Sequence, residues 1–342
     1  MKCTLKPGGE QTIVITGATS GIGLVTARKA ARRGAKLVLF ARNGDALDTL
    51  CDEIRQHGGL AVPVAGDVAN LEDLQRAAAQ AVDTYGGFDT WINNAGVSIF
   101  GTAAAVPLED QRRLFDTNYW GVVHGSLVAS DHFRRKGDFH GGAIINLGSE
   151  ASDAPLPLQS AYVASKPAVK GFTDSLRLEL ESDRLPVSVT LIKPAAMDTM
   201  FVMHAKNYMN VEAKLPPPIY DPELVADAIL FAAAHPRRTL FVGGAAKLAS
   251  AGAYPAPRLF DRRAATLFSR GQRTGRPARP RDDNALDASR HALHEREGME
   301  GPVLRGCAYN AVVQRPKVAG AVALGAAALM VAALARARRT TA

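Results

Sequence analysis

The sequence predicts an α/β protein built on one doubly wound, parallel sheet of seven strands. Up to about residue 245, short runs of β-branched and aliphatic residues alternate with longer stretches of helical periodicity, which is typical of strand–helix–strand units. The chain has 342 residues, enough to enclose a large core. Its composition, 47% hydrophobic and 22% charged, is that of a globular protein and excludes wholesale disorder and a polytopic membrane protein.

The strands are expected in the short apolar runs, at 12–16, 36–40, 61–65, 90–93, 143–147, 187–192 and 239–242. Helices are expected between them, at 22–33, 45–57, 70–85, 108–135, 159–182 and 222–234. Because these helices are long enough to connect parallel strands, we expect them to cover both faces of the sheet.

The character of the sequence changes after residue 248. Residues 1–248 hold 25 Lys and Arg against 26 Asp and Glu, whereas 249–342 hold 16 against 7, so the excess positive charge is C-terminal. Pro and Arg accumulate at 270–281 without hydrophobic periodicity, which indicates a solvated linker. We therefore predict a folded domain at 1–248, a basic, Pro/Arg-rich and partly disordered extension at 249–317, and an apolar helix at 318–335.

The apolar segment 318–335 has 18 uncharged residues between arginines and a lysine. As a helix it would measure about 27 Å, close to the roughly 30 Å hydrocarbon core of a membrane. It has no polar face, which favours a C-terminal membrane anchor, with an oligomerisation or core helix as the alternative. Basic residues at both ends leave its orientation open. The arginines are not interleaved with aromatics, so nucleic-acid binding is not favoured.

The cysteines indicate a reducing compartment. Cys3, Cys51 and Cys307 are few, odd in number and widely spaced, so they predict neither a disulfide framework nor a metal site. Residues 1–10 contain no apolar stretch of signal-peptide length. We expect a cytoplasmic catalytic domain, with the C-terminal segment as its candidate membrane anchor.

The first strand runs into a glycine-rich turn and then a helix, the context of a phosphate-binding turn. Its residues read Thr-Gly-Ala-Thr-Ser-Gly-Ile-Gly over 16–23. Glycines let the backbone approach a pyrophosphate, and the helix N-terminus offers unpaired N–H groups. A plain strand-ending turn is the alternative. The pattern predicts a dinucleotide site formed by Thr16, Gly17, Ser20, Gly21, Ile22 and Gly23.

Two later motifs follow in order, Asn-Asn-Ala-Gly at 93–96 and Tyr-Val-Ala-Ser-Lys at 162–166. With the turn, they resemble the short-chain dehydrogenase/reductase family over roughly residues 8–245. The turn spacing G-x-x-x-G-x-G is similar to that of the shorter oxidoreductase group rather than the extended one. The resemblance implies a Rossmann-type fold and cofactor contacts at Asp67, Val68, Asn94, Ala95, Gly96, Pro194 and Thr199. Asp67 could equally cap the next helix.

Cofactor choice depends on the end of the second strand. An acidic residue there would accept hydrogen bonds from the ribose 2′-OH of NAD. Ala41 stands where NAD-preferring members have Asp, and Arg42 follows. A guanidinium forms charge-assisted hydrogen bonds with a 2′-phosphate, so the sequence predicts NADP(H). A solvated surface arginine is the alternative, but it does not explain the missing carboxylate.

The catalytic residues are expected on one helix and on the ends of two neighbouring segments. Tyr162 and Lys166 are four residues apart, so they share a helix face, and an ammonium near a phenol favours phenolate. By resemblance, Tyr162 protonates the carbonyl oxygen, Lys166 holds the nicotinamide ribose, Ser149 binds the substrate oxygen, and Asn118 extends a proton relay. The alternative for Ser149 is an ordinary turn residue at the end of a strand. The alternative for Asn118 is that its side chain hydrogen-bonds a buried backbone group.

A loop after the sixth strand is expected to cover the substrate. It departs from the family's P-G-x-x-x-T by placing Ala195 where Gly is usual. Residues 196–220 carry several Met and aromatic side chains, which suit an apolar carbonyl or alcohol, or alternatively pack a dimer or sheet edge. We predict an NADP(H)-dependent ketone or aldehyde reductase that forms a homo-oligomer. The alternative is a membrane-tethered, cofactor-binding scaffold or sensor without turnover.

Overall fold

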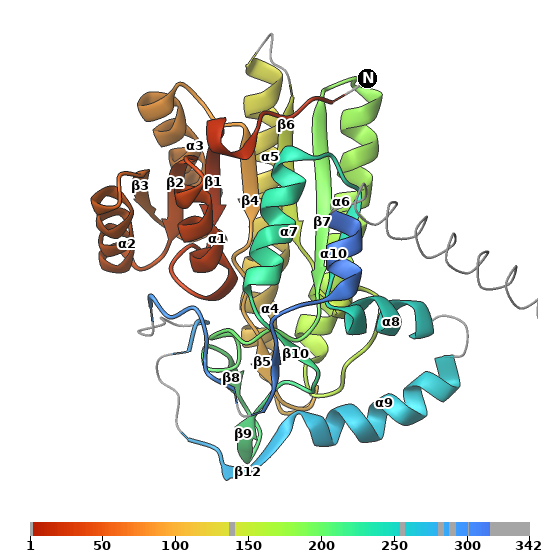
Figure 1. Cartoon of the computed structure of the whole chain (residues 1–342). Coiled ribbons are helices and arrows are strands. Elements are labelled where there is room, and N and C mark those ends of the chain that lie inside the picture. The colour runs from red at the N-terminus through yellow and green to blue at the C-terminus, as the bar shows by residue number, and fades with distance from the viewer. Residues whose placement is uncertain are drawn as a thin grey trace, which may run out of the picture.

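The computed structural model describes residues 3–136, 141–253, 257–279, 284–286, 292–299 and 301–314. Its centre is a seven-stranded sheet in the order β3-β2-β1-β4-β6-β7-β11, in which all neighbours run parallel (Figure 1). The strands are β1 (Thr12–Thr16), β2 (Lys36–Ala41), β3 (Leu60–Ala65), β4 (Thr90–Asn93), β6 (Gly142–Leu147), β7 (Val187–Pro194) and β11 (Thr239–Val242). The predicted Rossmann-type sheet is therefore confirmed.

Helices cover both faces of the sheet, and each face has its own apolar core. One core packs side chains from α1, α2 and α7 against the sheet, and the other packs α3, α5 and α6 (Figure 1). The bounds are α1 (Gly21–Arg32), α2 (Gly44–Gln56), α3 (Leu71–Tyr85), α5 (Gly121–Arg135), α6 (Ser160–Ser182) and α7 (Glu223–Ala234). Because both faces are buried, the strands are apolar almost throughout, as the sequence pattern indicated.

The predicted helix over 108–135 is divided in the structure. It consists of α4 (Leu108–Phe115), one π-helical turn (Asp116–Trp120) and α5. π-turns are often found at functional sites. The strand order reverses between β1 and β4, and this reversal opens a crevice at the carboxyl ends of the strands.

The extension beyond β11 differs from the sequence prediction. Its described residues form α8 (Gly244–Ala253), α9 (Pro257–Gly271), β12 (Arg273–Pro277), β13 (Val303–Leu304) and α10 (Ala308–Gln314). β12 pairs with β9 (Val211–Ala213), and the Gln272 side chain before it is fully buried. The described residues of 270–281 are mostly exposed, as the interpretation of a solvated linker expected, but they are not a plain linker, because β12 pairs as a strand.

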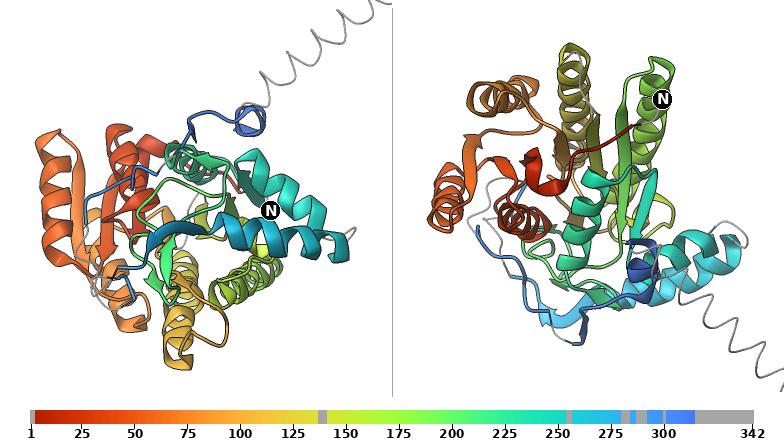
Figure 2. Two further views of the ribbon diagram at one scale, coloured as in Figure 1. Left: turned by 90° about the horizontal axis from the view of Figure 1, so that it is seen from below. Right: turned by 45° about the horizontal axis from the view of Figure 1, so that its top comes forward.

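The extension lies at one end of the sheet. α8, α9, β9 and β12 gather beyond the carboxyl ends of the strands (Figure 1), and the view from below shows α9 running across this end (Figure 2). Two further short pairs lie here, β5 (Ile99–Phe100) with β8 (Lys206–Asn207) and β10 (Ile219–Tyr220) with β13. The crevice is thus bordered by chain that follows the last strand of the main sheet.

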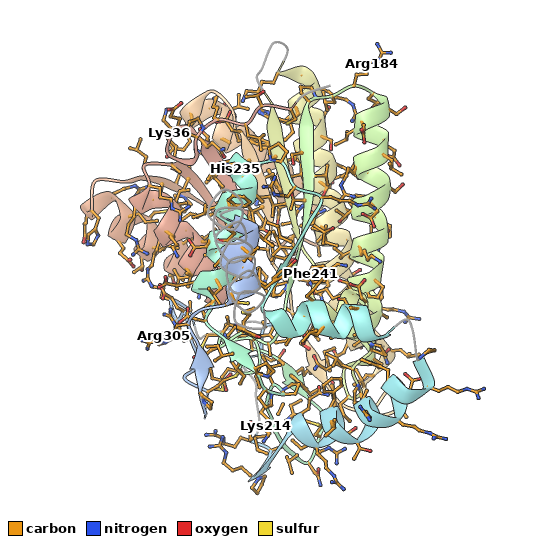
Figure 3. The ribbon with its side chains drawn as sticks, turned by 45° about the vertical axis from the view of Figure 1, so that its right-hand side comes forward. Lys36, Arg184, Lys214, His235, Phe241 and Arg305 are labelled. Atoms are coloured by element: carbon orange, nitrogen blue, oxygen red, sulfur yellow. The ribbon has the colours of Figure 1, made fainter. Side chains whose placement is uncertain are left out.

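Basic side chains lie at both ends of the molecule. Arg184 lies at one end of the molecule and Lys214 at the other (Figure 3). Within the described residues, no helix combines the length and the apolar character needed to cross a membrane. The predicted membrane segment 318–335 lies outside the described residues.

Candidate active site

The glycine-rich turn between β1 and α1 is held by the end of β4. Thr16 Oγ1 accepts hydrogen bonds from the N–H groups of Asn94 (3.0 Å) and Ala95 (3.2 Å) and donates one to the Ile92 carbonyl (3.2 Å). Asn94 Nδ2 donates to the carbonyl oxygens of Thr16 (2.9 Å) and Gly17 (3.1 Å). The Thr16 side chain therefore shapes the turn, and its contact with the cofactor stays a prediction.

Two glycines of the turn leave no room for a side chain. Gly17 has a φ of 66°, and a Cβ on it would lie 2.9 Å from the Ala95 Cα. A Cβ on Gly23 would lie only 2.1 Å from the Gly17 carbonyl oxygen. Gly23 therefore lets the first turn of α1 approach the strand, and Gly17 lets the backbone bend toward the crevice.

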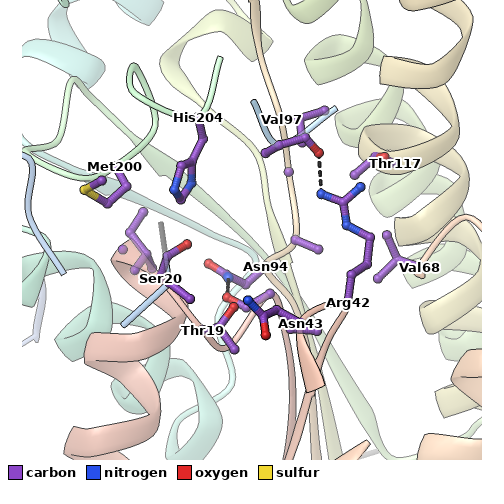
Figure 4. Close-up of a pocket in the computed structure, with 18 of the residues that line it drawn as sticks. Thr19, Ser20, Arg42, Asn43, Val68, Asn94, Val97, Thr117, Met200 and His204 are labelled. Atoms are coloured by element: carbon purple, nitrogen blue, oxygen red, sulfur yellow. Dashed lines mark hydrogen bonds between the residues drawn. The ribbon is translucent and has the colours of Figure 1, made fainter. Parts of the chain in front are cut away.

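A cavity of about 410 Å³ occupies the crevice, within the size range of small-molecule sites (Figure 4). It extends from the ends of β2 and β3 to the loop after β7. The predicted cofactor residues among its walls are Gly17, Ser20, Gly21, Ile22, Arg42, Asp67, Val68, Asn94, Ala95, Gly96 and Thr199. The predicted cofactor residues that do not line it are Thr16, Gly23, Tyr162, Lys166 and Pro194.

Arg42 lies at the end of β2 and lines the cavity beside Ala41 (Figure 4). Its guanidinium donates hydrogen bonds to the carbonyl oxygens of Ala285 and of Leu286, the latter at 3.5 Å. Among the described residues that form the walls, Asp67 is the one carboxylate, and it belongs to the segment after β3. The end of β2 therefore presents a cation to the cavity and no acidic group.

Asp67 is not the cap of the following helix, which was one of its two interpretations. Asn70 caps α3, because its side chain accepts a hydrogen bond from the Glu72 N–H. Asp67 Oδ1 accepts one from the Ala69 N–H at 3.0 Å, and the Asp67 carboxylate lies in the cavity wall. The interpretation of Asp67 as a cofactor contact stays a prediction.

The structure brings Ser149, Tyr162 and Lys166 together beside the cavity. Ser149 follows β6, whereas Tyr162 and Lys166 share one face of α6, with Lys166 Nζ 5.4 Å from the Tyr162 ring centroid. Lys166 Nζ donates to the Leu147 carbonyl at 2.9 Å. The ring of Phe201, which lines the cavity, lies 5.3 Å from the Tyr162 ring. Tyr162 therefore borders the end of the cavity that Phe201 encloses.

Burial dominates the ionisation of this group. It raises the pKa of Tyr162 to about 12, while a hydrogen bond from Ser149 lowers it and the nearby Glu150 carboxylate raises it. Burial also lowers the pKa of Lys166 to about 8 and raises the pKa of Glu150 to about 7. Burial raises the pKa of Tyr162 although Lys166 Nζ lies 5.4 Å from its ring centroid, so the expectation that the ammonium brings this pKa down is not met.

Ser149 is a turn residue, as its alternative interpretation held, and its contact with the substrate oxygen stays a prediction. Its Oγ accepts a hydrogen bond from the Ala151 N–H at 3.1 Å and caps the short 3₁₀ helix Glu150–Ser152. The Ser152 hydroxyl accepts one from the Ser149 N–H at 3.2 Å. This cap fixes the position of the Ser149 hydroxyl, which also bonds Tyr162. Ser149 is thus both a turn residue and a neighbour of the phenol.

Asn118 is fully buried in the π-helical turn. Its Oδ1 accepts from the Val97 N–H at 2.8 Å, and its Nδ2 donates to the Val97 carbonyl at 3.0 Å. A Cβ placed on Gly96 would lie 3.5 Å from Asn118 Oδ1 and 3.9 Å from Lys166 Nζ. Asn118 thus satisfies buried backbone, as its alternative interpretation held, and also faces the same small space as Lys166.

The loop after β7 accommodates Ala195 without strain. Ala195 is not among the described residues with positive φ, and its N–H donates to the Val242 carbonyl at 2.9 Å. Thr199 faces the glycine turn, since its Cβ lies 3.2 Å from a Cβ placed on Gly21. Met200 and Phe201 line the cavity, and Met197 packs in the core against the sheet. The loop therefore supplies both cavity wall and core.

Sequence reasoning missed several residues of the site. Glu150 was missed, although its position directly after Ser149 is a signal that could have identified it as a neighbour of Tyr162. The C-terminal residues Ala285 and Ala292 gave no signal, because alanines in a polar stretch carry no motif. The cavity-lining residues that were not predicted as cofactor contacts include Thr19, Phe40, Asn43, Gly66, Val97, Thr117, His204, Ala285 and Ala292. Among the described residues, no cluster of three or more His, Cys, Asp or Glu is placed to hold a metal ion.

Comparisons with known proteins cover the sheet domain and, for one relative, most of the C-terminal extension as well. The model of the short chain dehydrogenase family matches residues 11–209. An uncharacterized oxidoreductase of Bacillus subtilis, YxnA, is 45% identical over 326 residues, which cover 95% of this chain and 91% of that protein. A protein of Arabidopsis thaliana named 11-beta-hydroxysteroid dehydrogenase-like 3 is 35% identical over 193 residues, 55% of this chain and 60% of the plant protein.

A solved structure shows the same architecture. A short chain dehydrogenase/reductase from Burkholderia phymatum, in complex with NAD, superposes with a TM-score of 0.65 at 26% identity. The match covers 76% of this chain and 96% of the bacterial one. The similarity to the Bacillus subtilis protein extends beyond residue 209, where the family model ends, and so includes much of the C-terminal extension.

Proposed function

We propose a specific reaction from one premise: this chain belongs to the short-chain dehydrogenase family and is an oxidoreductase that uses a nicotinamide cofactor. The proposed reaction is the NADPH-dependent reduction of an apolar ketone or aldehyde to an alcohol. One arrangement carries the proposal, the grouping of Ser149, Tyr162 and Lys166 beside a cavity that has Arg42 at its other end.

The cavity fits a dinucleotide phosphate. Its glycine turn and the N-terminus of α1 suit a pyrophosphate, and Arg42 suits a 2′-phosphate at the end of β2. When bound, the reduced nicotinamide supplies the hydride. Thr199 would lie at the nicotinamide end, and Asp67 with Val68 at the adenine end, as expected from the family resemblance.

The side chains handle the proton and the developing charge. Tyr162 donates its hydroxyl proton to the substrate oxygen, and Ser149 donates a hydrogen bond that stabilises negative charge on that oxygen. A pKa of about 12 keeps the Tyr162 phenol protonated at neutral pH, as a proton donor requires. Lys166 and Asn118 would return a proton to Tyr162 from the buried space they share.

The substrate class follows from the walls beside Tyr162. Met200 and Phe201 line the cavity there, and Phe100 with Val202 forms an apolar cluster behind them. These groups offer dispersion contacts and few hydrogen bonds, which supports an apolar carbonyl compound. Identity beyond that class requires a screen of ketones and aldehydes with the purified protein.

The test is a parallel fluorescence titration with NADPH and NADH, followed by turnover with the carbonyl panel. We expect tighter NADPH binding and a loss of that preference in Arg42→Ala, because the 2′-phosphate loses its cation. Equal affinities in the wild type would overturn the NADP(H) assignment and leave the oxidoreductase. NADPH binding without turnover across the panel would favour the alternative, a cofactor-binding scaffold or sensor.

Assembly and location are further parts of the proposal. Leu108, Trp120, Leu127 and Leu178 are exposed on α4, α5, α6 and the π-turn, which supports a homo-oligomer tested by light scattering. A cytoplasmic domain tethered through 318–335 is tested by fractionating the full chain beside a version ending at residue 317. Equal solubility of both without detergent would overturn the anchor.

A further inference from the structure

The described chain returns to the cofactor cavity after β12. We call residues 284–286 and 292–299 the C-terminal strap. Ala285 and Ala292 form part of the cavity wall, and Leu286 is buried in an apolar cluster with Val97 and Leu114. The strap lies beyond residue 209, outside the segment that matches the family model.

At the adenine end, two arginines from different elements converge on the strap. Arg113 of α4 donates a hydrogen bond to the Leu286 carbonyl at 2.6 Å, and Arg42 reaches the same carbonyl at 3.5 Å. Arg42 also donates to the Ala285 carbonyl. These bonds are charge-assisted, so they hold the strap backbone more firmly than neutral ones would.

At the phosphate-binding turn, the strap bonds the backbone directly. The Gly21 N–H donates to the His294 carbonyl at 3.0 Å, and the Leu293 N–H donates to the Thr19 carbonyl at 2.7 Å. Leu293 has a φ of 63°, a left-handed conformation that a branched residue adopts only when its surroundings impose it. The strap is therefore fitted to this turn, and it does not merely lie near it.

Outer contacts anchor the second half of the strap away from the cavity. Glu295 forms an ion pair with Arg28 of α1 at 2.8 Å, and Arg296 bonds both carboxylate oxygens of Asp221, at 2.9 and 3.2 Å. The N–H groups of Gly298 and Met299 donate to Asp198 Oδ1 at 3.1 and 3.2 Å. Asp198 precedes Thr199, so the strap joins the phosphate turn to the nicotinamide loop.

The strap encloses the cavity and does not fill it. A volume of about 410 Å³ remains beneath it, continuous from Asp67 to Thr199. The strap carbonyls accept hydrogen bonds from Arg42, Arg113 and the Gly21 N–H, and of these Arg42 and Gly21 themselves line the cavity. The strap therefore forms one wall of the adenine and pyrophosphate part of the site.

We propose that the C-terminal strap is the outer wall of the cofactor site, that Arg113 is a positioning residue holding it shut, and that bound cofactor leaves only after the strap opens. This inference rests on the proposed function, because it needs a bound dinucleotide. Arg113 acts through the Leu286 carbonyl, so its removal loosens the wall while Arg42 remains available for the 2′-phosphate.

The test measures NADPH release from the full-length protein by stopped flow, with excess NADP⁺ as the chase. Two variants loosen different ends of the strap, Arg113→Gln at Leu286 and Arg296→Gln at Asp221. The matched controls remove the same charge without touching the strap. Arg112→Gln changes the exposed neighbour on α4, and Arg33→Gln removes an exposed ion pair with Asp227.

We expect both strap variants to release NADPH at least about fivefold faster, because changes in affinity act mainly on the dissociation rate. Both variants should keep the preference for NADPH over NADH. The controls should release NADPH at the wild-type rate. Because Arg296→Gln leaves Arg113 intact, a folding failure of one variant still leaves the other to decide.

The outcomes separate this inference from the proposed function. A folded wild type that binds neither nucleotide would remove the proposed function itself. Tight wild-type binding with unchanged release in both strap variants would overturn the strap alone. Slower release or tighter binding in the variants would also overturn it, because the strap would then oppose the cofactor as a plug.

Discussion

The two ends of the cavity are built in different ways. At the catalytic end, side chains of Ser149, Tyr162 and Lys166 from β6 and α6 meet, all within the segment that matches the family model. At the adenine end, backbone carbonyls of Ala285 and Leu286 close the wall from about 240 residues beyond Arg42. The structure of the catalytic end is specified by the chemistry of its side chains, whereas the strap is held in place through its backbone groups.

The largest effect is expected at the catalytic end. Tyr162→Phe removes the hydroxyl that donates the proton, so carbonyl reduction should fall about 100- to 10,000-fold. NADPH release should change far less than turnover, because the Phe variant keeps the ring that packs against the apolar cluster containing Leu286. Steady-state turnover and stopped-flow release on the same preparation measure both. Retained turnover would remove Tyr162 from its proposed role.

A comparison of two buried leucines measures whether the strap and the sheet unfold together. Leu39 is fully buried in β2, so Leu39→Ala should lower the free energy of unfolding by about 2–5 kcal/mol. Leu286 is also buried, at 4% exposure, but it belongs to the strap. If the strap opens on its own, Leu286→Ala should cost the global transition less than about 1 kcal/mol.

Urea denaturation of both variants provides this measurement. Hydrogen exchange at the amides of Leu293 and Gly21 adds a local one, because both amides bond across the strap–turn contact. Exchange there should accelerate in Leu286→Ala and not in Leu39→Ala under mild conditions. Equal losses in the global transition would mean that the strap is part of the same cooperative unit as the sheet.

This difference also explains what could be predicted from the sequence. The strands and main helices follow the hydrophobic pattern and agree with the structure to within two residues at their ends. Tyr162, Lys166 and Ser149 carry chemistry in their side chains, so the motif spacing and the family resemblance together identified them. Arg42 was found because a carboxylate is missing where an acidic residue would select NAD.

The strap could not be predicted because its contacts carry no residue-type signature. Any residue other than proline offers the N–H that Leu293 donates, and every residue offers the carbonyl that Leu286 presents. The pKa of Tyr162 was also misjudged for a physical reason: helix spacing reveals the neighbouring Lys166 but not how much water the fold removes. Desolvation is a property of the tertiary structure.

A smaller effect is expected from Glu150, which connects the catalytic end to pH. Its pKa of about 7 means that it is neutral below that pH and charged above it, and its charge raises the pKa of Tyr162. In alcohol oxidation, where Tyr162 acts as a base, activity rises with pH as Tyr162 loses its proton, and Glu150→Gln should move this rising limb of the pH profile to lower pH. The shift should be less than about one unit, equivalent to about 1.4 kcal/mol.

The same substitution changes stability with a defined sign. Because folding raises the pKa of Glu150 from 4.5 to about 7, the folded state binds more protons between these values. Wild-type stability should therefore fall as pH rises through this range, and the fall should be shallower in Glu150→Gln. Denaturation at pH 5 and pH 8 measures it, and parallel slopes would contradict the buried position of the carboxyl.

The smallest effect is expected where α1 contacts the strap. Arg28 of α1 bonds both oxygens of Glu53, at 2.8 and 2.6 Å, and pairs with Glu295 of the strap at 2.8 Å. Partly exposed ion pairs contribute little, so Arg28→Gln should lower the free energy of unfolding by about 1 kcal/mol or less. The loss should shrink near 1 M salt, where the screening length is about 3 Å.

Arg33→Gln is the control for Arg28→Gln, since Arg33 stands at the end of α1 and pairs with Asp227 of α7 and not with the strap, in an ion pair that is more exposed than Arg28–Glu295. If Arg28→Gln exceeds this control by more than about 2 kcal/mol, the surface ion pair alone cannot account for the loss. The sheet and the strap would then be coupled through α1, and the wall over the cofactor could not open without loosening the phosphate-binding turn beneath it.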